Sequence, residues 1–274
     1  MSFDFNLVLV GCGKMGQALL HGWVQQKTID VSKIIVIDPH CNDLALWSNQ
    51  GIKIFSHSDA IPNNFRPSLI VLAIKPQHFE NVLISYKRFV DKDTAFLSIA
   101  AGITFKFMER ILGTPVSLIR AMPNIAVLVQ SSITVLCSNK WVNKQHQEIS
   151  DKILKVVGDV IWIENETLFD PITALSGSGP AYIFFLAECM IKAAIKGGLP
   201  FDLAENLVRK TLIGSAFLSK ELVLETFANL RTKVTSPGGT TEAALNYLIH
   251  ESNFEEIIEK AIDQAVKRAF DLSK

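Results

Sequence analysis

Short runs of consecutive apolar residues alternate with helical patterns through the first half of the chain. Strands that are apolar at every position are typical of a parallel sheet covered by helices on both faces. The pattern therefore predicts an α/β domain. The runs expected to form its strands are Leu7–Val10, Ile34–Ile37, Ile52–Phe55, Leu69–Ile74, Ala95–Ile99 and Val116–Ala121. Edge strands are expected at Ile133–Cys137 and Val160–Ile163, around a helix near Lys144–Val157.

Beyond Glu164 the strand pattern disappears and helical patterns dominate. We therefore expect two domains, an α/β domain over residues 1–164 and an all-helical domain over residues 165–274. The last expected helix is clearly amphipathic, because its apolar residues recur at the three- and four-residue spacing of one helix face. The expected helices are Tyr182–Lys196, Leu203–Leu218, Leu222–Asn229, Glu242–His250 and Phe254–Leu272.

Composition narrows the classes of function. The 27 basic and 27 acidic residues cancel, which argues against nucleic-acid binding through bulk charge. A hydrophobic content of 49% is too high for a disordered chain. The longest stretch without a charged residue, Ala121–Asn139, contains Pro123, Asn124 and Gln130, so it is a poor membrane span.

The cysteines and histidines show no metal-binding spacing, and we expect no metal site. The four cysteines are scattered and form no CxxC pair. The apolar run near the N-terminus belongs to the first expected strand and is not preceded by a basic region, so we expect no signal peptide. A cytoplasmic protein with reduced thiols is the simplest interpretation.

A glycine-rich turn follows the first expected strand and opens a helix. The spacing is Gly11-x-Gly13-x-x-Gly16. In this context the first glycine permits a tight turn, the second lets a pyrophosphate approach the backbone, and the third allows close packing of helix and strand. The exposed N–H groups and the helix dipole then hold the phosphates. We expect Gly11, Gly13, Met15 and Gly16 to contact a dinucleotide, the alternative being a chance glycine triplet.

The second expected strand ends in Asp38, 22 residues after Gly16. A carboxylate at this position can accept hydrogen bonds from the adenosine ribose and would repel a 2′-phosphate, which favours NADH over NADPH. His40 and Asn42 are close enough in sequence to soften this discrimination, so use of both cofactors is compatible with the pattern. The alternative is that Asp38 is a turn residue before Pro39.

Three other strand ends carry unusual residues, and ligands of open α/β sheets lie beyond such ends. Lys75-Pro76 stops a buried strand abruptly and could pass close to the cofactor's ribose or diphosphate. Ala100-Ala101-Gly102 has only small side chains, which leaves room for a flat nicotinamide ring. Met122-Pro123-Asn124 is a third rigid turn at the same rim. Each turn alone suits an ordinary loop, whereas together they favour a cofactor cleft.

Two motifs of the helical half combine glycine with hydroxyl side chains. In Ala174–Tyr182 we expect a helix start, which Ser178 caps and in which Pro180 fills the first turn. Val234–Glu242 places two glycines between hydroxyls and a following helix. Such a helix start can hold a small anion, particularly a carboxylate. Ordinary N-capping by Thr240 is the alternative.

Taken together, these motifs resemble the pyrroline-5-carboxylate reductase family over nearly the whole chain and in the same order. The resemblance implies a Rossmann-type N-terminal domain and an all-α C-terminal domain that interlocks with its partner as a homodimer, with dimers that assemble further, often as decamers. It implies reduction of 1-pyrroline-5-carboxylate to L-proline, the last step of proline biosynthesis, with NADH or NADPH; many members prefer NADPH. The matching segments are Gly11–Gly16, Lys75–Gln77, Ala100–Gly102, Arg120–Asn124, Leu175–Tyr182 and Ser236–Thr241.

The resemblance also implies roles for individual residues. Thr241 is the expected catalytic residue, which lies beside the ring nitrogen as a hydrogen-bond or proton donor. The Leu175–Tyr182 loop would close around the nicotinamide and substrate. A protonated cyclic imine is already electrophilic, so alignment with the hydride donor and neutralisation of the carboxylate are what an enzyme must supply. Ser236, Gly238, Gly239 and Thr240 would hold the substrate carboxylate, and Lys75, Pro76 and Ala100 would line the cofactor.

Two alternatives stay open from the sequence. One is another Rossmann imine reductase or a β-hydroxyacid reductase, although the latter normally carries a lysine where Ile183 follows the glycine-rich turn here. The other is a non-catalytic NAD(P)-binding sensor, which would bind dinucleotide without turning over the imine.

Overall fold

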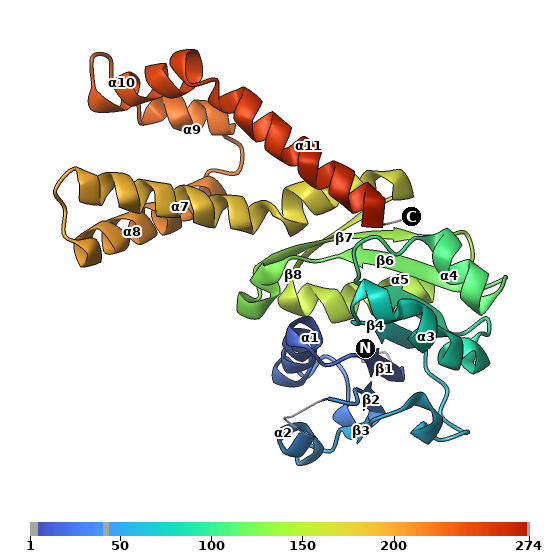
Figure 1. The fold of residues 1–274 in the computed structure, drawn as a ribbon. Helices are drawn as coiled ribbons and strands as arrows, with labels where there is room; N and C mark the ends of the chain where they lie inside the picture. Colours follow the sequence, from blue (N-terminus) through green and yellow to red (C-terminus); the bar gives the residue numbers. More distant parts are fainter. Residues whose placement is uncertain (1–4, 41–43, 273–274) are drawn as a thin grey trace. The chain divides into compact units, whose positions relative to one another are not determined.

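The computed structural model describes residues 5–40 and 44–272. The chain forms two compact units: one comprises the chain up to Ser178 and the segment from Ala265 onward, and the other is Gly179–Gln264. All strands of the described residues belong to the first unit, and the second is helical (Figure 1). The sequence places a boundary near residue 164, whereas this division falls after Ser178, because Glu166 and the residues that follow it pack on the sheet.

The first unit is built on an eight-stranded sheet in the order β3-β2-β1-β4-β5-β6-β7-β8. Neighbouring strands are parallel except for β6 and β7, which run antiparallel. The order reverses between β1 and β4, which is where ligands bind in doubly wound sheets. The strands are β1 (Leu7–Val10), β2 (Ile34–Ile37), β3 (Lys53–Phe55), β4 (Leu69–Leu72), β5 (Ala95–Ser98), β6 (Ser117–Met122), β7 (Ser132–Ser138) and β8 (Gly158–Ile163).

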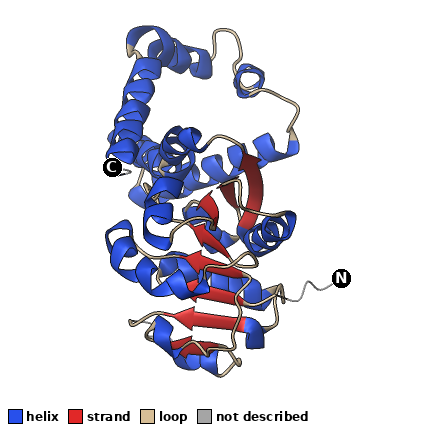
Figure 2. Cartoon of the chain, turned by 90° about the vertical axis from the view of Figure 1, so that its right-hand side faces the viewer, coloured by secondary structure: helices blue, strands red, loops and turns tan. Residues whose placement is uncertain are grey.

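Helices cover both faces of this sheet, as the apolar strands predict (Figure 2). Adjacent strand residues point to opposite faces, so Leu7 lies in the core under α1 and α5, and Val8 lies in the core under α3 and α4. The buried indole of Trp23 in α1 donates a hydrogen bond to the Ile153 carbonyl of α5 at 2.7 Å. The helices are α1 (Lys14–Gln25), α2 (Leu44–Ser48), α3 (Phe79–Leu83), α4 (Phe105–Leu112), α5 (Lys144–Leu154) and α6 (Phe169–Ile172). The Rossmann-type α/β fold is confirmed.

The second unit is a set of helices, as the sequence predicts. The turn between α7 and α8 contains Gly198 at φ 97°, a left-handed conformation that suits glycine at a helix end. The last helix begins in this unit and continues into the first from Ala265. The helix expected at Leu222–Asn229 begins instead at Phe227, where the Thr226 side chain caps it. The helices are α7 (Gly179–Lys196), α8 (Phe201–Glu221), α9 (Phe227–Lys233), α10 (Thr240–Asn246) and α11 (Phe254–Leu272).

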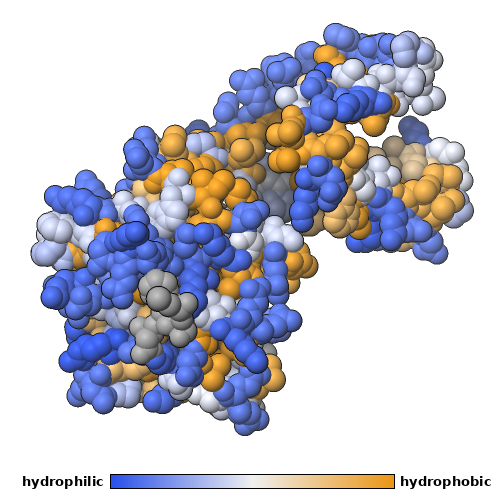
Figure 3. Space-filling model, turned by 180° about the vertical axis from the view of Figure 1, so that it is seen from behind, coloured by the Kyte–Doolittle hydropathy of each residue, from blue (hydrophilic) through white to orange (hydrophobic). Residues whose placement is uncertain are grey.

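Large apolar side chains of the second unit are exposed rather than buried (Figure 3). The exposed fraction is 62% for Phe184 and 61% for Phe217. Contiguous apolar surface of this kind normally marks an interaction face. The helical run Glu166–Lys196 is also long and apolar enough to cross a membrane by length and composition alone. Charged residues such as Glu188 interrupt this run, so it contains no long uncharged stretch.

Candidate cofactor and substrate sites

The turn after β1 has the geometry of a phosphate-binding loop. Gly11 has φ 92°, and a Cβ built there would lie 2.5 Å from the Ala73 carbonyl oxygen. A Cβ at Gly16 would overlap the Gly11 carbonyl, so α1 packs closely on the strand only because this residue is glycine. Gly13, the N-cap residue of α1, has open space within 4 Å of its Cβ position. The three glycines thus leave a cradle that fits a diphosphate.

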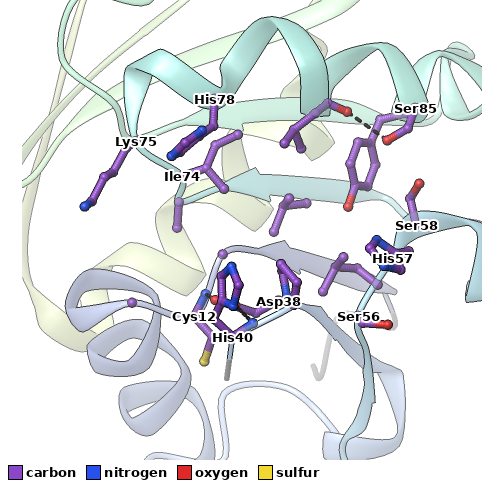
Figure 4. Close-up of a pocket in the computed structure, with 18 of the residues that line it drawn as sticks. Cys12, Asp38, His40, Ser56, His57, Ser58, Ile74, Lys75, His78 and Ser85 are labelled. Carbon is purple, nitrogen blue, oxygen red and sulfur yellow. Dashed lines mark hydrogen bonds between the residues drawn. The ribbon is translucent and has the colours of Figure 1, made fainter. Parts of the chain in front are cut away.

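A pocket of about 880 Å³ opens at the carboxyl ends of β1, β2, β3 and β4 (Figure 4). It is lined by the loop residues Gly11 and Gly13, by Asp38 and by Lys75. The remaining residues expected to contact a cofactor do not line it: Met15 packs against the core under α1, Gly16 lies against Gly11, Pro76 opens a turn after β4, and Ala100 follows β5.

The Asp38 carboxylate is directed toward the glycine-rich turn. Its Oδ2 accepts the backbone N–H of Cys12 at 2.5 Å, and its Oδ1 accepts the backbone N–H of His40 at 2.7 Å. The Asp38 N–H donates to the Phe55 carbonyl at 3.0 Å, which continues the pairing of β2 with β3. One side chain therefore joins the ends of β1 and β2. Each carboxylate oxygen has a second lone pair free for a ligand hydroxyl.

The sequence reasoning missed the far side of the pocket, which comes from the loop after β3 and from the segment after β4. His57 and Ser58 line it from the first, and Ser85 lines it from the second (Figure 4). Tyr86 also lines the pocket from the second segment. Arg88 holds the β3 loop in place, because its Nη2 donates to the Ser58 carbonyl at 2.6 Å. The short third strand was the available signal, since the residue that follows a parallel strand lies at the same rim as Asp38.

The turn after β6 contacts the start of the Leu175–Tyr182 motif. Asn124 Oδ1 accepts the N–H of Ala126, and its Nδ2 faces Ser176 Oγ at 3.4 Å. A Cβ at Gly177 would lie 2.5 Å from Met122 Cε, so a larger residue would displace that side chain. These contacts bring the turn after β6 next to the start of the Leu175–Tyr182 motif.

The expected N-cap role of Ser178 is wrong, although α7 begins at Gly179 and has Pro180 in its first turn. Residues 173–177 form a π-helical turn within a helical run that continues into α7, and the Ser178 N–H donates to the Thr173 carbonyl at 2.9 Å. Ser178 has helical φ and ψ rather than the extended conformation of an N-cap. Pro180 has no N–H and cannot continue a regular ladder, and a π-turn is one way in which helices absorb such an interruption.

A buried ion pair stabilises this region from behind. The guanidinium of Arg120, whose side chain is 5% exposed, lies 2.7 Å from Glu166 Oε1 and 4.3 Å from the centre of the Phe169 ring. The same Glu166 oxygen accepts the N–H of Phe105 at 2.8 Å. Burial raises the pKa of the nearby Asp170 carboxyl, and Arg120 opposes that shift. The pair fixes the segment after β8 against β6.

The Ser236–Thr241 segment of the second unit forms a tight turn at the start of α10. Gly238 has φ 71°, and the Gly239 N–H donates to the Ser236 carbonyl at 3.0 Å. The N-cap residue of α10 is Gly239, so N-capping by Thr240 is not the role of this motif. The Gly238 N–H donates to the Glu242 carboxylate at 2.7 Å. The turn therefore donates a backbone N–H to the chain's own Glu242 carboxylate.

Comparison with protein-family models matches both halves of the chain. Residues 166–272 match the model described as pyrroline-5-carboxylate reductase dimerisation. Residues 6–102 match the model described as NADP oxidoreductase, coenzyme F420-dependent. Neither match covers the region between them, which contains β6, β7 and β8.

Curated relatives cover the whole chain. The pyrroline-5-carboxylate reductase of Pseudomonas aeruginosa is 32% identical over 271 residues, which is 98% of this chain and 97% of that protein. The enzyme of the same name from Pisum sativum is 30% identical over 273 residues, covering 100% of this chain and 98% of that protein.

Solved structures agree with these matches. The pyrroline-5-carboxylate reductase of Coxiella burnetii superposes with a TM-score of 0.89 at 33% identity, covering 99% of both chains. The Plasmodium falciparum pyrroline carboxylate reductase with NADP bound gives a TM-score of 0.84 at 28% identity, covering 100% of both chains. A reductive aminase from Aspergillus terreus shares only the fold, at 13% identity and a TM-score of 0.56.

Proposed function

The chain belongs to the pyrroline-5-carboxylate reductase family, and from that premise we propose how its residues perform the reaction. It is an NAD(P)H-dependent oxidoreductase that reduces 1-pyrroline-5-carboxylate to L-proline, the last step of proline biosynthesis. The observation that carries this conclusion is full-length similarity to such enzymes combined with a glycine cradle that fits a diphosphate. The chain is also a homo-oligomer through its helical half.

The cofactor lies, in this proposal, along the rim of β1, β2 and β4. The N–H groups of the Gly11–Gly16 turn and the N-terminus of α1 bind the diphosphate, and Asp38 binds the adenosine ribose. Lys75, Pro76 and Ala100, which follow β4 and β5, line the cofactor toward its nicotinamide half. When bound, the reduced cofactor supplies the hydride for the imine carbon.

The substrate carboxylate is bound by the Ser236–Thr241 turn. Ser236 donates from its hydroxyl, and Gly238 and Thr240 donate from their backbone N–H groups, while the Gly239 N–H closes the turn on the Ser236 carbonyl. The Glu242 carboxylate on the Gly238 N–H supports this assignment, because it shows the turn holding the same functional group. The substrate carboxylate takes that place when it binds.

Thr241, in the first turn of α10, directs its hydroxyl toward the ring nitrogen of the imine. A hydrogen bond there favours the protonated iminium, whose carbon accepts hydride, and orients the ring for transfer. The site thus needs no strong acid, because the carboxylate turn and Thr241 together fix the substrate.

We further propose that the enzyme prefers NADH. The Asp38 carboxylate stands at the end of β2, where a 2′-phosphate would meet its negative charge. The exposed apolar faces of α7 and α8 support a homodimer, and dimers can associate further, as in a decamer. Cys137 and Cys189 are free thiols, which suits the cytoplasm.

The test is an assay of the purified full chain with racemic 1-pyrroline-5-carboxylate and either NADH or NADPH. We expect loss of reduced-nicotinamide absorbance, with formation of proline and a faster rate at low NADH than at low NADPH. Cofactor binding without turnover would favour a sensor. Turnover only with other imines or with β-keto acids would favour the neighbouring reductase classes.

A further inference from the structure

Tyr86 carries a buried hydroxyl that the fold does not satisfy. The residue lies in the turn Ile84–Phe89 after α3, is 1% exposed, and packs with Phe79 and Phe89 in the core under α3 and α4. Among residues 5–40 and 44–272, no group forms a hydrogen bond with its hydroxyl oxygen. Buried tyrosine hydroxyls normally have such a partner, so this one needs an explanation.

Packing does not explain the hydroxyl. A phenylalanine would place the same ring in the same apolar core without burying a polar group. Arg88 is near enough to influence Tyr86 electrostatically, yet its Nη2 is held by the carbonyls of Ser58 at 2.6 Å and Ile61 at 3.3 Å. Burial raises the pKa of Tyr86, so the hydroxyl keeps its proton and can donate it to an acceptor.

The same residue lines the pocket described above. The glycine turn and Asp38 occupy one part of that pocket, and they correspond to the diphosphate and the adenosine ribose. The part beyond Asp38 lies between the β3 loop and the segment after β4, where Ser58 and Ser85 flank it across from Lys75 (Figure 4). A dinucleotide laid from the glycines past Asp38 places its base there.

The lining of this part suits a flat heterocycle. The side chain of Val82 contributes apolar surface, and the Ser85 hydroxyl already donates to the Val82 carbonyl at 2.8 Å. Tyr86 is therefore a buried side-chain donor of this region that is left without a partner among the described residues. Adenine presents ring nitrogens and an amino group along its edge, each of which can pair with a phenol.

We propose that Tyr86 is a cofactor-binding residue, whose hydroxyl forms a hydrogen bond with the edge of the adenine ring. This inference rests on the proposed function, because it assumes a dinucleotide in the pocket. It explains why the core contains tyrosine where phenylalanine would pack equally well: the unpaired hydroxyl of the free protein gains its partner when the cofactor binds.

The test compares Tyr86→Phe with the unaltered full chain. Calorimetric titration with NADH and with ADP-ribose, which keeps the adenine but lacks nicotinamide, is expected to show a three- to tenfold loss of affinity for both, roughly one hydrogen bond. Turnover driven by reduced nicotinamide mononucleotide, which lacks adenine, is expected to be unchanged. The ligand-free variant is expected to melt about 2 °C higher, because it no longer buries an unpaired hydroxyl.

Tyr247→Phe is the matched control, since Tyr247 is 57% exposed in the second unit and lies outside this pocket. It is expected to change neither the affinities nor the melting temperature. Equal ADP-ribose affinity of Tyr86→Phe and the unaltered chain would overturn the proposal, as would a lower melting temperature of the ligand-free variant. If the unaltered chain binds neither NADH nor ADP-ribose, the proposed function itself fails.

Discussion

The Asp38 carboxylate accepts a hydrogen bond from the backbone N–H of Cys12 at 2.5 Å. The residue expected to discriminate between NADH and NADPH therefore also stabilises the glycine-rich turn. A substitution at Asp38 therefore has two consequences. Loss of charge changes discrimination at the 2′-position, and loss of the acceptor loosens the loop that binds phosphate. A substitution that removes the charge but keeps an oxygen acceptor for the Cys12 N–H distinguishes the two effects.

Asp38→Asn removes the charge and retains an oxygen that can accept the Cys12 N–H. We expect the ratio of kcat/KM for NADPH over NADH to rise about fivefold, which corresponds to roughly 1 kcal/mol of relieved repulsion. Asp38→Ala is expected to raise KM for both cofactors, because it also removes the acceptor. An unchanged ratio in both variants would show that Asp38 does not face the 2′-position.

Thr241→Ala tests the assigned catalytic role. We expect kcat to fall roughly 10- to 100-fold while cofactor affinity stays the same, because the hydroxyl is proposed to contact the substrate nitrogen only. Thr241→Ser is the control, since it keeps the hydroxyl, and it is expected to restore most of the rate. Cofactor affinity that falls in parallel with kcat would contradict the assignment.

Glu166→Ala leaves the buried Arg120 without its anion. We expect a loss of about 3 kcal/mol in the free energy of unfolding, because an unpaired buried charge keeps its full desolvation penalty. Glu148→Ala is the control: Glu148 pairs at 3.8 Å with Lys144, whose side chain is 88% exposed, so the expected loss is under about 1 kcal/mol. Urea denaturation measures both, and equal losses would show that Arg120 is solvated.

The central strands could be read from the sequence because β1, β2, β4 and β5 are buried on both faces, which leaves an apolar run that ends sharply at polar residues. β1, β2 and Phe254–Leu272 have the expected bounds. Capping side chains determine where the less regular helices begin. Thr226 caps α9 and so indicates its start at Phe227, whereas the spacing of apolar residues alone favoured an earlier start.

The pocket's far side could not be read in the same way. His57 and Tyr86 both line this pocket because β3 lies beside β2, and β4 lies beside β1, in the sheet. The spacing of residues along the chain does not reveal this strand order. The π-turn before Pro180 was missed for a related reason. Whether a proline starts a helix or interrupts one depends on what the preceding residues pack against.

The pH dependence of stability provides a prediction at the opposite end of the strands from the pocket. His146 is 1% exposed, and burial lowers its pKa below the usual 6.5, although Asp93 and Asp91 oppose the shift. The unfolded chain then binds a proton more readily than the folded one. Stability should therefore be full above about pH 6.5 and fall as the pH drops toward the folded pKa.

His146→Gln should remove this dependence without removing the helix cap. The imidazole Nδ1 faces the Asn143 N–H at 3.5 Å, and glutamine at this third helical position can accept the same N–H. We expect the loss of unfolding free energy between about pH 7.5 and about pH 5 to be smaller in the variant. An identical loss in both proteins would assign the dependence to other groups.

Gly11 and Gly13 offer a final test, because they differ in what a methyl group would meet. At Gly13 the backbone has φ −70°, an ordinary value, and no atom lies within 4 Å of the Cβ position. Gly13→Ala should therefore fold with unchanged stability. The added methyl occupies space that the diphosphate needs, so we expect cofactor affinity to fall roughly 10- to 100-fold, as for an overpacking cost of about 1–3 kcal/mol.

Gly11→Ala, in contrast, should lower the stability of the ligand-free protein. Its φ of 92° and the Ala73 carbonyl 2.5 Å from the Cβ position make alanine strained before any ligand binds, at a cost of at least about 2 kcal/mol in unfolding free energy. Urea denaturation of the ligand-free proteins and calorimetric titration with NADH separate the two effects. If Gly13→Ala binds NADH normally, the diphosphate does not approach the backbone there, and the cradle has been assigned to the wrong part of the turn.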